Sequence, residues 1–480
     1  MSAPNPASSS PAGTPPAAAS PSTTTRRSPD GLGARRPLWR LFLVFLGPMI
    51  LSNILQSLSG TLNTMFLGQM MGVKALAAVA SFFPVMFVFI AFIIGLGAGG
   101  SVLIGQAWGA GQIQKVRAIA GTTLLMGLLF GAVVALFGGL FTRPIMQLLG
   151  TPADILEQAT TYSRIVLLGM PGLFVFLLAT SLLRGVGDTL SPMWSLILST
   201  AIGLVSTPAL IAGWWGLPQL GVTSAAVSMI LGFSVSLLWL GVHLYRQGSV
   251  LAPNRALLKA LRIDRELLKG VLHVGVPTGV LMIATSLAGL VVMALVNGFG
   301  SDATAAFGAV NQINSFAQFP LISVAITSSI LAAQSIGADD NARLPAIART
   351  AMLFTVLLGS ATALLGSIFA RPLLGIFITN AEVLHTAVEL LYIVLWSGLL
   401  FGAFASLSSL MRASGDVVMP TAITIGVLAV LELPLAWLLS QRFGLVGIWL
   451  AFPLSYGITL GLQAWYYHAV WKKRPIRKLV

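Results

Sequence analysis

The sequence predicts an all-α membrane protein with twelve transmembrane helices in two six-helix lobes, related by a parallel internal repeat. Three observations predict this fold: the composition, a series of long apolar segments, and a set of residues that recurs at a fixed offset. Hydrophobic residues occupy 56% of the 480 positions, and charged residues only 8%. Soluble domains carry about 25% charged residues. The solvent around most of this chain is therefore lipid.

Twelve apolar segments follow residues 1–36, which are rich in Pro, Ser and Ala and which we expect to form a disordered tail. An apolar stretch of about 20 residues spans a bilayer as a helix. The arginine pairs before the first segment imitate a signal peptide, but the apolar run is too long for one and has no convincing cleavage site. The segments are 38–68, 76–106, 116–141, 155–183, 190–214, 218–245, 270–298, 302–336, 343–369, 382–411, 417–440 and 444–470.

Basic residues are distributed unequally between the two sides of the membrane. Of the 27 Lys and Arg residues, 22 fall on the side that holds both termini, four fall on the other side, and Arg164 lies within a segment. Loops rich in Lys and Arg remain in the cytoplasm. We therefore expect a multi-pass protein of the cytoplasmic (inner) membrane with both termini in the cytoplasm.

These boundaries divide the chain into an N-lobe (37–245), a linker (246–269), a C-lobe (270–471) and a basic tail (472–480). In the linker, leucines and charges segregate at helical spacing around residues 256–268. This pattern predicts a short amphipathic helix on the membrane surface, where its bases face anionic headgroups. A plain tether between the lobes is the alternative interpretation.

The two halves share residues at an offset of 228 positions, and a fixed offset across rare residue types indicates a repeat. Six segments in each half start both halves on the same face, so the pseudo-two-fold axis follows the membrane normal. Pro48 and Pro277 match with an offset of 229. The 228-residue matches include Gln106 with Gln334, Gly109 with Gly337, Phe141 with Phe369, Pro144 with Pro372, Arg184 with Arg412, Gly187 with Gly415, and Asp188 with Asp416.

Several classes of function are disfavoured or excluded. The chain has no cysteine, which excludes disulfides and thiol chemistry, and its four histidines show no spacing typical of metal ligands. The net charge of +14 reflects membrane orientation rather than nucleic-acid binding. Residues 95–100 match a dinucleotide-binding GxGxxG pattern but lie within an apolar segment, so close helix packing is expected. We expect neither an enzyme nor a cofactor.

Proline and amide side chains within the segments are the first candidates for a transport site. Pro48 and Pro277 open the first segment of each half and are predicted to be paired bending elements that face the axis; ordinary kinks are the alternative. The amides recur three or four positions apart and form either a cavity wall or packing hydrogen bonds between helices. They are Asn53, Gln56, Asn63, Asn311, Gln312, Asn314 and Gln318.

Ionisable residues within the segments are scarcer. Glu432 lies deep in segment 417–440, where we expect its carboxylate to bind a proton or hold a cation; snorkelling or a local hydrogen bond is the alternative interpretation. The repeat places Arg164 one turn from Glu389, so we expect an ion pair whose role is structural or cation-coupling. Turn capping and gate contacts are expected from Arg184, Asp188, Arg412 and Asp416.

Two motifs carry a resemblance to a known family. Residues 103–110, LIGQAWGA, are similar to a GQxxGA motif, and residues 184–192 are similar to an RGxGDTxxP motif. With its degenerate second copies, the chain resembles the multidrug and toxic compound extrusion (MATE) family over about residues 38–470. The resemblance implies two lobes around a central cavity that alternate in access. It also implies export of small cationic or amphipathic compounds, driven by protons or sodium. We expect a monomer.

The chain departs from this family at the usual coupling positions. Asn63 stands where a helix-one aspartate is usual, Thr207 stands before the proline of segment five, and the positions around Thr285 and Phe401 are uncharged. Glu432 is the remaining deep carboxylate and is therefore the predicted substitute.

Two other functions stay open. A flippase for lipid-linked oligosaccharides would be expected to carry several cavity arginines, whereas only Arg164 lies within a segment. A channel or a scaffold without transport is the other alternative, but a channel typically has symmetric subunits or filter-like rings. The internal two-lobe repeat favours a carrier.

Overall fold

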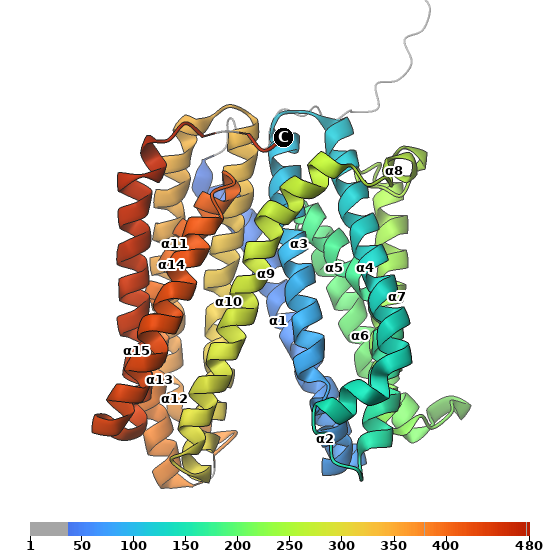
Figure 1. Ribbon diagram of the computed structural model, residues 1–480, viewed down its shortest axis with the longest axis vertical. Coiled ribbons are helices and arrows are strands. Elements are labelled where there is room, and N and C mark those ends of the chain that lie inside the picture. Colours follow the sequence, from blue (N-terminus) through green and yellow to red (C-terminus); the bar gives the residue numbers. More distant parts are fainter. Residues whose placement is uncertain (1–36, 379, 477) are drawn as a thin grey trace, which may run out of the picture.

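The computed structural model describes residues 37–378, 380–476 and 478–480, and these residues contain helices and no β-strand. The predicted tail 1–36 lies outside the described residues. Figure 1 shows two bundles of helices side by side, in agreement with the predicted pair of lobes. We call the end at which α8 and the C-terminus lie the tail end, and the end at which α2 and α12 lie the far end (Figure 1).

The N-lobe and the linker hold the first eight α-helices. They are α1 (Leu38–Met71), α2 (Val73–Ala80), α3 (Phe83–Gly109), α4 (Ile113–Leu148), α5 (Leu156–Gly185), α6 (Leu190–Ala212), α7 (Ser224–Arg246) and the linker helix α8 (Arg255–Ala260). The C-lobe holds α9 (Arg265–Asn297), α10 (Ser301–Gly337), α11 (Leu344–Ile368), α12 (Ala370–Gly375), α13 (Ala381–Ala413), α14 (Val418–Val427), the π-helical turn η4 (Leu428–Glu432) and α15 (Leu433–Ala469).

Eleven helical stretches in the described residues are long and apolar enough to cross a membrane, and the last of them makes two crossings. That stretch, Val418–Lys473, has 56 residues, so a straight helix would be about 84 Å long. The backbone leaves helical geometry at Gly444, with φ 60° and ψ −141°. Beyond this point, Gln463 Nε2 donates to Thr424 Oγ1 at 2.9 Å, which requires the chain to fold back on itself. The fold therefore has the predicted twelve crossings.

The repeat is visible in the backbone as well as in the sequence. Phe141 in α4 has φ −103° and ψ 15°, and its equivalent Phe369 has φ −96° and ψ 14°. Each phenylalanine precedes a proline by three residues, and proline lacks the amide hydrogen that continues a helix. Both lobes therefore break the same helix at the same place.

Two predicted boundaries are wrong. The segment 76–106 is two helices, because the chain turns at Ser81 and Phe82 and α3 begins around Pro84. The amphipathic helix expected around 256–268 covers only Arg255–Ala260. Asp264 accepts hydrogen bonds from the amides of the first turn of α9 and starts that helix at Arg265, five residues before the predicted C-lobe boundary.

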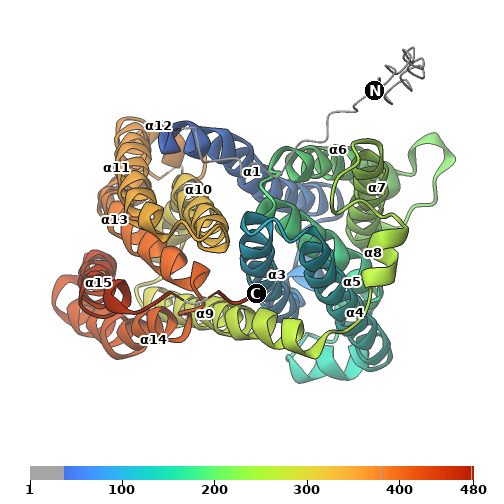
Figure 2. The same cartoon turned by 90° about the horizontal axis from the view of Figure 1, so that it is seen from above.

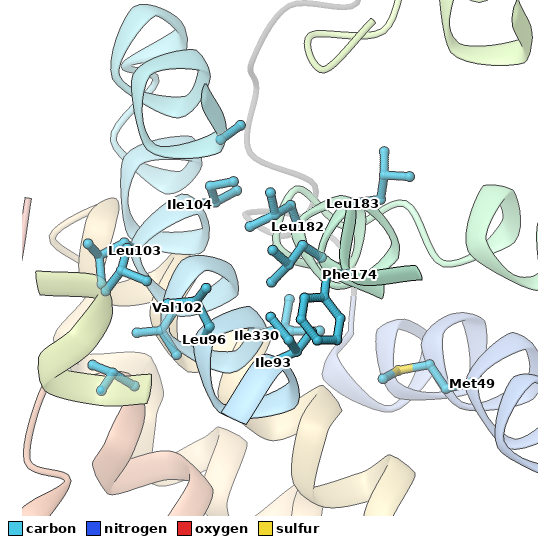
Figure 3. Close-up of a cluster of buried hydrophobic side chains, with 14 of the residues drawn as sticks. Met49, Ile93, Leu96, Val102, Leu103, Ile104, Phe174, Leu182, Leu183 and Ile330 are labelled. Carbon is cyan, nitrogen blue, oxygen red and sulfur yellow. The ribbon is translucent and has the colours of Figure 1, made fainter. Parts of the chain in front are cut away.

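The apolar core joins the lobes near the tail end. One buried cluster contains N-lobe residues such as Leu103 and Ile104 together with C-lobe residues such as Ile330 and Met411. Figure 3 shows Ile330 among the side chains of α3 and α5. A second cluster, around Trp449, contains C-lobe residues alone. Consistent with this, Figure 1 shows the inner helices of the lobes diverging toward the far end.

Candidate functional site

The lobes meet at the tail end through a reciprocal pair of hydrogen bonds. Gln106 Nε2, at the end of α3, donates to the carbonyl of Ala413 at 2.8 Å. Gln334 Nε2, at the end of α10, donates to the carbonyl of Gly185 at 3.0 Å. Donors and acceptors are both 228 positions apart, so the two bonds are equivalent under the repeat. We call these four residues the gate.

Two glycines let the helix ends of the gate approach closely. A Cβ atom on Gly109 would overlap with the carbonyl oxygen of Gln334, and one on Gly337 would overlap with that of Gln106. Only residues without a side chain fit at these two positions. The GQxxGA motif and its copy therefore supply both the hydrogen-bonding amide and the close contact of a lobe-to-lobe gate.

A second contact between lobes is the crossing of α3 with α9, which also depends on glycine. A Cβ atom on Gly95 would meet the backbone of Gly275 and Gly279, and one on Gly99 would meet the carbonyl of Val271. Small residues at four-residue spacing let two membrane helices pack backbone to backbone. The GxGxxG match of residues 95–100 is thus a packing feature, as predicted.

The equivalent contact, between α1 and α10, is made by side chains. Asn53 Nδ2 donates to Ser323 Oγ at 3.1 Å, and Thr327 Oγ1 lies 3.5 Å from Met49 Sδ. Pro48 precedes Met49 directly, and Pro277 lies between the glycines of the α9 crossing. Both prolines therefore lie at contacts between lobes, which is consistent with their predicted position toward the axis.

The predicted amides divide into two groups. Asn53 binds Ser323 across the lobes, and Asn63 Oδ1 accepts from Thr207 Oγ1 at 2.9 Å within the N-lobe, so both act as packing hydrogen bonds. In the part of the chain that the structure describes, the other amides have no protein hydrogen-bond partner and remain the candidates for substrate contacts. They are Gln56, Asn311, Gln312, Asn314 and Gln318.

Glu432 is a buried carboxylate without a partner. It ends the π-helical turn η4, its exposed fraction is 7%, and it makes no hydrogen bond or ion pair with any described residue. A π-helical turn inserts an extra residue into a helix and is frequent at functional sites. Because a charge buried in protein or lipid is costly without a counter-ion, this carboxylate is suited to bind a proton or a cation.

An aromatic cluster lies beside Glu432. Gln463 pairs with Thr424 across the turn at Gly444, so the part of α15 that holds Tyr456 folds back along the segment that holds Glu432. The ring of Tyr456 lies 5.7 to 6.1 Å, centroid to centroid, from three phenylalanine rings of α13 and α15. These are Phe401, Phe404 and Phe452. Aromatic faces attract cations, so these rings are further candidates for contact with a cationic ligand.

The expected ion pair between Arg164 and Glu389 is not formed. Glu389 instead lies 3.7 Å from His385 one turn earlier in α13, with 56% of its side chain exposed. Arg164 is also exposed, on α5, and makes no ion pair or hydrogen bond with the described residues. The repeat therefore does not bring these two side chains together as a pair.

The charged residues of the two repeated turns have different roles. Asp188 accepts from the backbone amide of Ser191 at 3.0 Å and caps the first turn of α6, as predicted. Its copy Asp416 accepts instead from Tyr466 Oη at 2.6 Å, which links the turn to α15. Arg412 donates to Ser409 Oγ at 2.6 Å. For Arg184 no hydrogen bond or ion pair is found with the described residues.

No local sequence pattern predicts the reciprocal gate bonds or the aromatic residues near Glu432. The repeat does relate the two gate bonds to each other. Once the bond from Gln106 to Ala413 is known, the offset of 228 positions predicts the bond from Gln334 to Gly185. The aromatic cluster combines residues of α13 and α15, which are distant in the chain. Only the packed lobe brings them together.

Comparisons with known proteins identify the class. The profile of the MatE family matches residues 48–209 and again residues 277–438, one match for each lobe. The chain therefore belongs to the MatE family of membrane transport proteins and is not an enzyme. The two matches begin 229 residues apart, at Pro48 and Pro277, which confirms the predicted repeat and the predicted family.

Relatives of the chain match it over nearly its whole length. It is 40% identical over 445 residues to the probable multidrug resistance protein YoeA of Bacillus subtilis, covering 92% of this chain and 96% of the relative. It is 27% identical over 435 residues to a FAD transporter of Shewanella oneidensis, covering 88% and 94%. The identity to the probable multidrug resistance protein NorM of Thermotoga maritima is 23% over 446 residues, covering 92% and 94%.

Solved structures share the fold. A variant of the Vibrio cholerae MATE transporter VcmN superposes with a TM-score of 0.84 at 22% identity, covering 92% of this chain and 98% of that one. A multidrug resistance MATE family transporter described in an outward-facing conformation superposes with a TM-score of 0.84 at 20% identity, covering 91% and 97%. Together with the helices, these matches confirm the two-lobe membrane fold.

Proposed function

We propose that the protein is a secondary active transporter that exports small amphipathic or cationic organic compounds by alternating access, with entry of H⁺ or Na⁺ as the driving force. Glu432 carries this proposal, because it is a buried carboxylate without a partner in the C-lobe. The relatives named as multidrug resistance proteins support the substrate class. No cofactor is needed beyond the coupling ion, and the working unit is a monomer.

The tail end is the cytoplasmic end in this proposal. The linker and the C-terminus, which are rich in Lys and Arg, lie there (Figure 1), and such segments stay in the cytoplasm. The gate is closed at that end, which supports the assignment, within this proposal, of the closed-gate form to the outward-facing state of the cycle. Opening the gate would give access from the cytoplasm.

We propose that ion entry is coupled to substrate export because the coupling ion and the substrate exchange at Glu432 in the C-lobe. A proton or a sodium ion occupies the carboxylate of Glu432, and the rings of the aromatic cluster are further candidates for contact with a cationic ligand. An organic cation competes for the same negative charge. Because a ligand shifts a conformational equilibrium only by its difference in affinity between the two states, we expect occupation of Glu432 to differ between the open and closed gate.

The test is transport by purified protein in liposomes with a fluorescent organic cation such as ethidium. Proton and sodium gradients are imposed separately, and the wild type is compared with Glu432→Gln, which keeps the shape of the side chain and removes the charge. We expect one gradient to drive dye movement and the substitution to abolish it. Gradient-driven transport that survives in Glu432→Gln would remove this residue from the coupling step.

A further inference from the structure

The residues after Trp471 run from the end of α15 back over the gate. Trp471 Nε1 donates to Ser414 Oγ at 2.9 Å, and its ring stacks on Tyr467 with a centroid distance of 5.1 Å. These contacts fix the start of the C-terminal tail. From here on, the C-terminal tail means the part of the basic tail that follows Lys473, of which the structure describes residues 474–476 and 478–480. In Figure 2 the C-terminus lies near the centre of the molecule, between the lobes.

The end of the tail contacts both lobes. The backbone amide of Leu479 donates to Gln106 Oε1 of the N-lobe at 2.7 Å. Lys478 Nζ lies 2.7 Å from Asp339 Oδ2, just after α10 of the C-lobe. The side chain of Leu479 lies against Gly415 of the C-lobe, and Ile476 and Val480 pack on the cluster that joins the lobes.

Gln106 is the centre of this arrangement. Its side chain is fully buried, its Nε2 donates to the carbonyl of Ala413, and its Oε1 accepts from Leu479. Among the described residues, the side chain of the equivalent Gln334 only donates, to the carbonyl of Gly185, and its Oε1 accepts no hydrogen bond. The tail therefore breaks the two-fold symmetry of the gate and completes the hydrogen bonding of one of its two amides.

We propose that the C-terminal tail is a latch that holds the gate closed and must detach before the lobes separate at this end. The proposal rests on the alternating access of the proposed function. Its physical basis is that the tail belongs to the C-lobe chain but bonds an N-lobe residue, Gln106, that moves away when the gate opens. A tail that contacted one lobe alone would not respond to this movement.

The contacts of the latch differ in strength. The pair of Lys478 and Asp339 is largely exposed, with 32% and 78% of the side chains accessible, and exposed ion pairs contribute little. The bond from Leu479 to a buried amide and the apolar contacts of Leu479 and Val480 contribute more. We therefore expect removal of the tail to have a larger effect than loss of the ion pair.

The experiment measures the distance between the lobes by double electron–electron resonance. The chain has no cysteine, so cysteines placed at Gln112 and Ala342 can be labelled without further changes. Both residues are exposed, and they flank the gate on the N-lobe and the C-lobe. The full-length protein in liposomes is compared with a chain that ends at Lys473, in the absence of substrate and of any gradient.

We expect the truncated chain to populate the longer, open-gate distance at least threefold more than the full-length chain, while it still inserts into the membrane as a folded protein. Lys478→Glu should give a smaller increase, and adding Asp339→Lys should reverse it. Lys473→Glu is the matched control, because it makes the same charge change on an exposed residue whose side chain has no partner among the described residues, and it should have no effect.

An unchanged distance distribution in the truncated chain would overturn the latch. If the truncated chain does not insert into the membrane, Leu479→Asp tests the same contacts in a full-length chain, and no shift there would also overturn the proposal. The readout needs neither dye nor gradient. Transport can therefore fail while the distances shift as expected, which would contradict the proposed function and leave the latch intact.

Discussion

Gln106 and Gln334 bind across the lobe interface in opposite directions, each through its side-chain amide to a backbone carbonyl of the other lobe. The acceptors, Ala413 and Gly185, are related by the same offset of 228 residues as the donors. Separation of the lobes at this end breaks both bonds together. The gate is thus a single cooperative contact whose two halves open at once.

Loss of either gate amide should favour the open gate. Gln106→Leu and Gln334→Leu leave the carbonyls of Ala413 and Gly185 without their donors, and an unsatisfied polar group costs about 1–3 kcal/mol when buried. The distance measurement across the gate should show more of the open state, with the larger effect for Gln106→Leu, which also loses the bond to the tail. Gln114→Leu, on the exposed face of α4, is the control. Equal distributions in all three variants would argue against the gate.

A side chain at Gly337 should prevent closure. Gly337→Ala places a methyl group against the carbonyl of Gln106, whereas Gly308→Ala in the same helix meets no atom within 4 Å. We expect Gly337→Ala to hold the gate open and to lower transport at least tenfold, and Gly308→Ala to behave like the wild type. The distance measurement across the gate should report the difference as a larger open-gate population in Gly337→Ala. Equal distance distributions in both variants would refute the close contact.

The glycine crossing of α3 and α9 should be sensitive to one methyl group. Gly275→Ala would bring a Cβ atom to 2.9 Å from the carbonyl oxygen of Gly95, whereas Gly289→Ala on the same helix meets open space. Overpacking typically costs about 1–3 kcal/mol. The melting temperature in detergent should therefore fall for Gly275→Ala and stay constant for Gly289→Ala. Equal melting temperatures of Gly275→Ala and Gly289→Ala would contradict the close packing of α3 against α9.

Asn63 should contribute to stability through Thr207. Thr207→Val removes the donor to Asn63 Oδ1, and such bonds between membrane helices average about 0.6 kcal/mol. We expect a small drop in melting temperature with dye transport retained. Thr64→Val, which loses only a bond within its own helix, is the control. Abolished transport in Thr207→Val at normal stability would instead place this pair in the transport site.

The twelve crossings and the repeat could be predicted because hydrocarbon imposes a strong pattern on composition and because equivalent turns keep their residues. Phe141 and Phe369 even adopt the same backbone angles. The glycine packing of residues 95–100 could also be predicted, since a dinucleotide loop has no place within a membrane helix.

Side-chain partners could not be predicted in the same way. The repeat relates positions in the two halves but does not give the direction of a side chain, and Arg164 and Glu389 do not pair. Asp188 and Asp416 occupy equivalent turns, yet one caps a helix and the other binds Tyr466. The docking of the tail on Gln106 depends on contacts between residues 373 positions apart, which local patterns do not report.

The most direct test of the proposed coupling compares two carboxylates in one assay. Glu432 is buried without a partner, whereas Glu389 is exposed beside His385. Dye movement driven by a proton or sodium gradient should be lost in Glu432→Gln, by at least tenfold, and retained in Glu389→Gln at equal amounts of protein in the liposomes. Retained transport in Glu432→Gln, or its loss in Glu389→Gln alone, would contradict the assignment of the coupling site to the C-lobe carboxylate at the end of the π-helical turn.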